Sequence, residues 1–162
     1  MTVTITVDSS TPVDLADNER LYVSSDAELV VASGTAVRRA AAGFNGFEVA
    51  IDGSVIAVNS NAIQLFDDEF DIGNNRLDIS PDGIVRTLSI AGNSAVYMTG
   101  SGNYLQNAGD VSGNWGAFLQ DYDNGIVENH GNMLGMYQSA IYLTGSANVS
   151  VTNTGLTSGG GG

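Results

Sequence analysis

The sequence predicts an all-β protein, a single-stranded parallel β-helix (β-solenoid) of about five to six coils. One observation is a long internal repeat. Ser94 opens the run Ser-Ala-Val-Tyr-Met-Thr-Gly-Ser-Gly-Asn, and Ser139 opens Ser-Ala-Ile-Tyr-Leu-Thr-Gly-Ser-Ala-Asn, which lies 139 − 94 = 45 residues later. A second observation is a partial copy of the repeat about halfway between these two copies, at Gly116-Ala-Phe-Leu119 and Asn129-His-Gly131. This half-step match reduces the repeat unit to about 22 to 24 residues. Short repeats of this kind form one solenoid coil each.

A third observation is an asparagine that recurs at one point of the repeat and is followed two residues later by glycine. The asparagines are Asn107, Asn129 and Asn153, and the glycines are Gly109, Gly131 and Gly155. Parallel coils lie about 4.8 Å apart, so equivalent side chains stack directly on one another. Stacked asparagines can pass side-chain amide hydrogen bonds from coil to coil. We therefore expect a structural asparagine ladder with glycines beside it.

The β-propeller is the main alternative fold, because 45 residues is also the length of one propeller blade. The half-step match argues against a blade of four strands, and the chain has no Trp-Asp blade motif. The sequence therefore favours the solenoid.

Taken in order, residues 2–7 alternate threonine with valine or isoleucine, which predicts a half-buried strand. We interpret residues 1–19 as an N-terminal cap, residues 20–159 as the solenoid and residues 160–162 as a glycine tail. Asp-Gly at 52–53 and 82–83, and the glycines at 109 and 131, are expected to provide positive φ at turns. An alanine followed by a large residue, at 36, 62, 95, 117 and 140, is expected to mark one corner of every coil.

Composition limits the classes of partner. The chain has 5 basic and 18 acidic residues, a formal net charge of −13, which disfavours nucleic acid and anionic membranes because both require a basic surface. It contains no cysteine and no apolar run of the ~20 residues that span a bilayer, so we expect neither disulfides nor membrane insertion. The N-terminal residues do not resemble a signal peptide, which leaves three interpretations: a cytoplasmic protein, export without an N-terminal signal, or a processed or truncated chain. We expect an extracellular or cell-surface location.

The densest acidic cluster lies in an insertion between two coils. It consists of Asp67, Asp68 and Asp71, with Glu69. Carboxylates of this kind can bind Ca²⁺. The cluster lacks the spacing of a known calcium loop, so a solvated acidic loop is the other interpretation. No further cofactor is expected.

A second group of carboxylates suggests carbohydrate chemistry. Asp121, Asp123 and Glu128 belong to neighbouring stretches of the repeat, and paired carboxylates cleave polysaccharides by acid–base chemistry. Aromatic side chains for sugar stacking are present nearby, at Trp115, Tyr122 and Tyr137. The single histidine, His130, fits a turn, and no Gly-x-Ser-x-Gly or phosphate-loop motif occurs. We expect the protein not to be an enzyme.

The Asn-x-Gly coils over residues 47–159 resemble those of secreted bacterial parallel β-helix proteins, such as autotransporter passenger domains and haemolysin-type exoproteins. The resemblance implies export and a structural or adhesive role. The stretch Val151–Gly159 begins a coil without completing it, which indicates either a fragment of a longer protein or an open edge that docks on another subunit. We expect the second, a homo-oligomer or filament. The predicted function is a structural or adhesive solenoid that self-associates; the alternative is a carbohydrate-binding or polysaccharide-cleaving β-helix. A third interpretation, an antifreeze-type face, depends on a row of threonines that includes Thr99 and Thr144.

Overall fold

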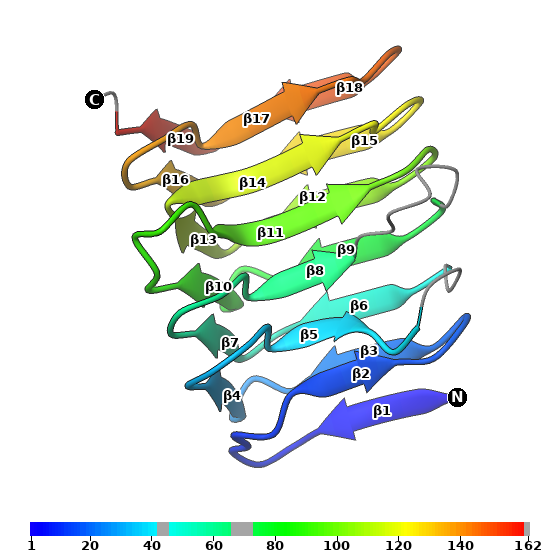
Figure 1. Cartoon of the computed structure of the whole chain (residues 1–162), viewed down its shortest axis with the longest axis vertical. Coiled ribbons are helices and arrows are strands. Elements are labelled where there is room, and N and C mark those ends of the chain that lie inside the picture. The colour runs from blue at the N-terminus through cyan, green and yellow to red at the C-terminus, as the bar shows by residue number, and fades with distance from the viewer. Residues whose placement is uncertain (42–45, 66–72, 161–162) are drawn as a thin grey trace.

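The chain winds through three parallel β-sheets in a repeating order, as Figure 1 shows for the computed structural model. The structure describes residues 1–41, 46–65 and 73–160. Each full coil contributes one strand to sheet A, then one to sheet B, then one to sheet C, and the next coil stacks on it in parallel. The predicted β-solenoid is therefore confirmed, and the propeller is wrong, because every strand pairs with its counterpart in an adjacent coil.

The strands fall into three columns. Sheet A holds β1 (Thr2–Ile5), β3 (Arg20–Val23), β6 (Glu48–Ile51), β9 (Arg76–Ile79), β12 (Tyr104–Asn107), β15 (Ile126–Asn129) and β18 (Ser150–Asn153). Sheet B holds β4 (Glu28–Val31), β7 (Ser54–Ala57), β10 (Ile84–Thr87), β13 (Asp110–Gly113), β16 (Asn132–Gly135) and β19 (Leu156–Gly159). Sheet C holds β2 (Val13–Leu15), β5 (Val37–Arg39), β8 (Ile63–Leu65), β11 (Ser94–Thr99), β14 (Trp115–Gln120) and β17 (Ile141–Thr144).

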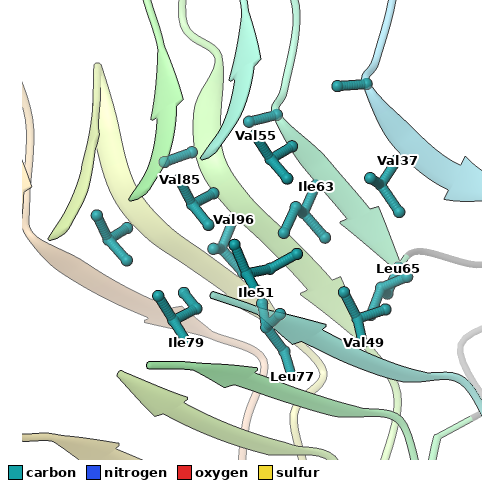
Figure 2. Close-up of a cluster of buried hydrophobic side chains, with 14 of the residues drawn as sticks. Val37, Val49, Ile51, Val55, Ile63, Leu65, Leu77, Ile79, Val85 and Val96 are labelled. Atoms are coloured by element: carbon teal, nitrogen blue, oxygen red, sulfur yellow. The ribbon is translucent and has the colours of Figure 1, made fainter. Parts of the chain in front are cut away.

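Aliphatic side chains fill the space between the three sheets (Figure 2). In sheet A, Leu77, Leu105 and Val127 occupy one register position in successive coils and are fully buried. Leu65, Met98 and Leu119 do the same in sheet C. Strand alternation sends every second residue inward, so each coil supplies a layer that packs on the layers above and below. This burial of apolar surface is the main stabilising contribution to the fold.

Residues 1–19, which we interpreted as an N-terminal cap, provide strands β1 and β2 at the first positions of sheets A and C. Strand β1 pairs with β3 over its full length, and β2 pairs with β5 in the same way. In sheet B the first coil contributes only an isolated bridge between Ser9 and Leu29. The segment therefore has the geometry of the first coil.

A column of left-handed residues marks the corner between sheets C and A. Each member lies two residues before a sheet A strand and has φ between 53° and 70°; the members are Asn18, Gly46, Asn74, Gly102, Asn124 and Asn148. Asparagine and glycine are the residues that tolerate this conformation best. A Cβ atom at Gly46 would lie 2.5 Å from the Oδ1 atom of Asn18, so the glycine also makes room for the asparagine below it. The spacing of this column was not recognised in the sequence.

A second glycine column has a different cause from the one we expected. Gly53, Gly83, Gly109, Gly131 and Gly155 each precede a sheet B strand, and none of them has a positive φ. A Cβ atom on Gly131 would lie 2.2 Å from the carbonyl oxygen of Gly109 in the coil below. The expectation of positive φ was wrong: these glycines allow neighbouring coils to approach closely.

In one coil, the corner position at which we expected an alanine is occupied by a different residue. Ala117 pairs with Val96 and with Ile141, and thus lies one position beyond the corner alanines Ala95 and Ala140. Gly116 therefore takes the corner position in this coil, where a Cβ atom would lie 2.4 Å from the carbonyl oxygen of Ala140. Matching Ala117 to the other alanines was wrong by one residue.

We predict that Gly131→Ala lowers the free energy of unfolding by about 1–3 kcal/mol, because the new methyl group would collide with backbone that cannot move aside. His130→Ala is the matched control, since the His130 ring is exposed and bonds only to the Thr154 hydroxyl through Nδ1. The control should change stability by less than about 0.5 kcal/mol. Urea unfolding followed by circular dichroism measures both, and equal midpoints would contradict the close-approach argument.

Candidate functional sites

The asparagine column is a continuous run of side-chain amide hydrogen bonds. Asn107 Nδ2 donates to Asn129 Oδ1 at 2.7 Å, and Asn129 Nδ2 donates to Asn153 Oδ1 at 2.7 Å. The same register position holds aliphatic residues in the earlier coils, of which Ile51 and Ile79 are the last two. In the bore, the space enclosed by the three sheets, this column therefore changes from aliphatic side chains to amide side chains at Asn107.

The amides also bond to the backbone of the adjacent corner. Asn107 Oδ1 accepts from Gly109 N at 3.1 Å, and Asn107 Nδ2 donates to the carbonyl oxygen of Asn132 at 3.1 Å. Asn107 and Asn129 are fully buried, so these contacts satisfy polar groups that have no access to water. The ladder therefore orders the corner between sheets A and B.

The outermost strands of the three sheets at the C-terminal end form a second candidate site, the C-terminal face, which consists of β17, β18 and β19. Leu143 and Val151 point into the bore but are 38% and 46% exposed, whereas Leu119 and Val127 one coil earlier are fully buried. The face encloses a hollow of about 380 Å³ lined by residues that include Val151, Asn153 and Thr157. Apolar surface of this kind favours contact with another protein surface.

A cluster of four rings covers the outside of sheet C, and we call Tyr97, Trp115, Phe118 and Tyr142 the aromatic platform. Tyr97, Phe118 and Tyr142 occupy one register position in three successive coils. Ring centroids are 5.1 Å apart for both Tyr97–Phe118 and Phe118–Tyr142, and Trp115 lies 5.4 Å from Phe118 and 4.7 Å from Tyr142. The Tyr97 hydroxyl donates to Gln120 Oε1 at 3.0 Å.

The outside of sheet A is charged. Arg20 pairs with Glu48 at 2.8 Å, and Arg76 pairs with Asp78. The Arg76 guanidinium also lies 4.3 Å from the centroid of the Tyr104 ring, and the hydrogen bond to Asp78 raises the pKa of Arg76. The Tyr104 hydroxyl donates to Glu128 Oε2 at 2.6 Å, which raises the pKa of Tyr104. Arg20 and Glu48 belong to adjacent coils, whereas Arg76 and Asp78 lie two residues apart in β9. With the Tyr104 bond to Glu128, each of these three carboxylates has a partner.

The carboxylates suggested for polysaccharide cleavage have contacts of their own. Asp121 has φ of 49°, at a corner position that Gly145 occupies with φ of 65° in the next coil. Asp123 Oδ1 accepts a hydrogen bond from Ala147 N, and Glu128 accepts from Tyr104 on the outer face of sheet A. Asp121 and Asp123 thus lie at a corner, whereas Glu128 lies within a sheet.

The aromatic residues named from the sequence separate in the structure. Trp115 belongs to the aromatic platform, and Tyr137 is 54% exposed. Tyr122 is fully buried, its hydroxyl donates to the carbonyl oxygen of Ile126 at 3.3 Å, and burial raises its pKa. Tyr122 therefore cannot stack on a sugar. Tyr97, Phe118 and Tyr142 were missed, although their recurrence at one repeat position was visible in the sequence.

The proposed calcium residues Asp67, Asp68 and Asp71 lie outside the residues that the structure describes. Within the described residues, no group of three or more histidine or acidic side chains is placed to hold a metal ion. The threonine row does not continue either, because Gln120 lies between Thr99 and Thr144 in sheet C.

Comparison with known proteins gives no relative: no protein-family profile, curated protein or solved structure matches the chain significantly. The structure shows a parallel β-solenoid, and the comparisons give no support for a relation to secreted bacterial β-helix proteins. Over the described ranges, no helix is long and apolar enough to cross a bilayer.

We predict that Asn129→Asp destabilises the fold by about 3 kcal/mol at neutral pH, because it places an unpaired carboxylate in the bore and removes the donor to Asn153. Asn153→Asp is the matched control, since Asn153 is exposed at the end of the same column. Burial would raise the pKa of the new carboxyl group above the ~3.9 of the unfolded chain. The deficit should therefore be small below that pH and grow as the pH rises.

Urea midpoints of both variants between pH 3 and pH 8 give the test, with the wild type measured at each pH. A buried amide ladder requires a pH-dependent loss at position 129 and a change below about 1 kcal/mol at position 153. Equal, pH-independent effects at both positions would contradict it.

Proposed function

We propose that the protein is a structural β-solenoid whose copies stack end to end, with the C-terminal face of one copy on the first coil of the next. The observation that carries this proposal is the exposure of bore side chains at the C-terminal face. Leu143 and Val151 are 38% and 46% exposed, although their counterparts in the preceding coil are fully buried. An assembly of this kind suits a structural or surface-coating role.

Open strand edges support the same arrangement. Strands β17, β18 and β19 are the last strands of sheets C, A and B, and β1 and β2 are the first strands of sheets A and C. An outermost strand presents backbone groups that pair readily with a strand of another chain. Stacking the last coil on the first would continue sheets A and C with the parallel pairing that they already have.

A two-fold contact between two C-terminal faces fits less well. It would pair the strands antiparallel, and it would place at least two of the three sheets opposite a different sheet. Head-to-tail stacking instead repeats the geometry of every internal coil contact and extends without closing.

The register columns are compatible across such a contact. Val151 would meet Val3, an apolar pair like those inside the solenoid. Asn153 would meet Ile5, which lies in the same column at the opposite end of sheet A. The chain already contains a contact of this type, because Asn107 stacks on Ile79.

Charge opposes the assembly. Each copy has a formal net charge of −13, so stacked copies repel one another at low ionic strength. Salt reduces the screening length to about 3 Å at 1 M, so association should strengthen as salt is added.

We predict that the 162-residue chain forms particles much larger than its 16.7 kDa monomer in high salt, and that Val151→Asp abolishes them by placing a charge on the C-terminal face. Leu88→Asp is the control, because Leu88 is 51% exposed at a lateral corner. Sedimentation velocity over a range of protein and salt concentrations measures the assembly. A wild-type chain that stays monomeric throughout would overturn the proposal.

Mixing the variant with the wild type determines the direction of stacking. A Val151→Asp copy keeps an intact first coil, so head-to-tail growth predicts that it binds the C-terminal face of a wild-type copy and stops extension. Small molar fractions of the variant should then shorten the particles. If the wild-type assemblies keep their size, the C-terminal faces bind each other and the head-to-tail arrangement is wrong.

A further inference from the structure

Four adjacent strands of sheet C form an uncharged stretch of the surface. Strands β8, β11, β14 and β17 contain no acidic or basic residue, although the chain as a whole carries a formal net charge of −13. The same register column begins with Asp14 and Arg38 in β2 and β5, which form an ion pair. Along the solenoid the outside of sheet C thus changes from a charged to a neutral surface.

The aromatic platform lies on this neutral part of sheet C, where Figure 1 shows β11, β14 and β17 stacked on one another. Tyr142 is 37% exposed, and Tyr97, Trp115 and Phe118 are each partly exposed. Three of the rings follow the solenoid axis at a spacing of 5.1 Å, one ring in each coil. Because each ring packs against at least one other ring of the platform, the rings form a preorganised surface that loses little entropy when a ligand binds.

Neutral polar groups border the rings. Gln64 precedes Tyr97 in the same column, and Gln120 and Thr144 stack in the neighbouring outward column. Amide and hydroxyl side chains both donate and accept hydrogen bonds. The surface therefore offers partly exposed aromatic rings beside uncharged polar groups, and its strands contain no charge to bind an ionic ligand.

We propose that the aromatic platform binds a neutral polysaccharide whose chain runs along the solenoid axis across β11, β14 and β17. Sugar rings combine apolar C–H faces, which stack on aromatic rings, with hydroxyl groups, which bond to amides. A linear glycan also matches the one-dimensional repeat of the platform, because successive sugars would meet equivalent positions in successive coils. The platform shares β17 with the C-terminal face, but it uses the outward side chain of Tyr142, whereas end-to-end stacking uses the free edge of that strand and the bore side chains. Binding to the outward rings therefore does not require end-to-end stacking.

The protein carries its own probe for this site, because Trp115 is the only tryptophan in the chain. Titration with soluble neutral polysaccharides, such as a β-glucan, a xylan and a galactomannan, should change the tryptophan emission in a saturable way for at least one of them. The affinity should change little with salt, since neither partner is charged at the contact. Polygalacturonate serves as the anionic comparison and should not bind.

Variants assign the binding to the platform. Tyr142→Ala should weaken binding about tenfold, as expected for the loss of one exposed stacking ring, and Tyr142→Phe should restore most of the affinity. Tyr22→Ala is the matched control, because Tyr22 is 36% exposed on sheet A, away from the platform. Isothermal titration calorimetry gives these affinities independently of the emission.

Three results would overturn the proposal. The first is that none of the neutral polysaccharides binds, or that only polygalacturonate does. The second is that Tyr142→Ala and Tyr22→Ala bind as well as the wild type. The third is that the tryptophan emission shifts with protein concentration alone and no longer responds to glycan, which would show that a second copy covers the platform. The Val151→Asp variant, in which end-to-end stacking is blocked, separates failure of this site from failure of the assembly.

Discussion

Parallel pairing between adjacent coils is the constraint on which the rest of the structure depends. It places each residue about 4.8 Å from its equivalents above and below, so every register position becomes a column of side chains in contact. A column is stable only if each side chain can pack against, or hydrogen-bond to, the equivalent side chains in the coils above and below it. The bore meets this condition with aliphatic residues, and the column that ends at Asn153 meets it with amides that donate and accept in series.

The same spacing determines the corners. Where two backbone segments approach closely, a Cβ atom has no room, and glycine recurs before the sheet B strands, as at Gly109 and Gly131. Where the chain turns from sheet C into sheet A, the corner needs a left-handed residue, and asparagine and glycine share that column. Glycine thus has two separate functions in this chain, one steric and one conformational.

The outer surfaces follow the same rule with different chemistry. Sheet A places Arg20, Glu48 and Arg76 at one position of successive coils, so opposite charges alternate along the axis. Sheet C places Tyr97, Phe118 and Tyr142 at one position, where their rings pack edge to face or tilted. The ends differ from the sides because the last coil has no neighbour on one side, which exposes Val151 and the edges of three strands. Assembly is therefore proposed at the ends and ligand binding on a side.

Some features could be predicted from the repeat and others could not. The recurrence of Asn107, Asn129 and Asn153 predicts their stacking, since a constant repeat length implies a constant register. Ala117 was misplaced by one residue because Gly116 performs the role of the corner alanine, and residue type alone cannot distinguish the two. Tyr122 and Trp115 were both suggested from the sequence as rings for sugar stacking. Tyr122 is buried in the bore, whereas Trp115 lies on the outer face.

By itself the sequence determined the winding, the length of the coil and the amide column, because these depend on periodicity, and periodicity is a property of the chain. The tertiary structure decided which side of each strand faces water, why each glycine is required and which aromatic rings come together. These depend on distances between coils and on the direction of each side chain. Contacts between residues more than twenty positions apart set both, and a linear pattern does not contain them.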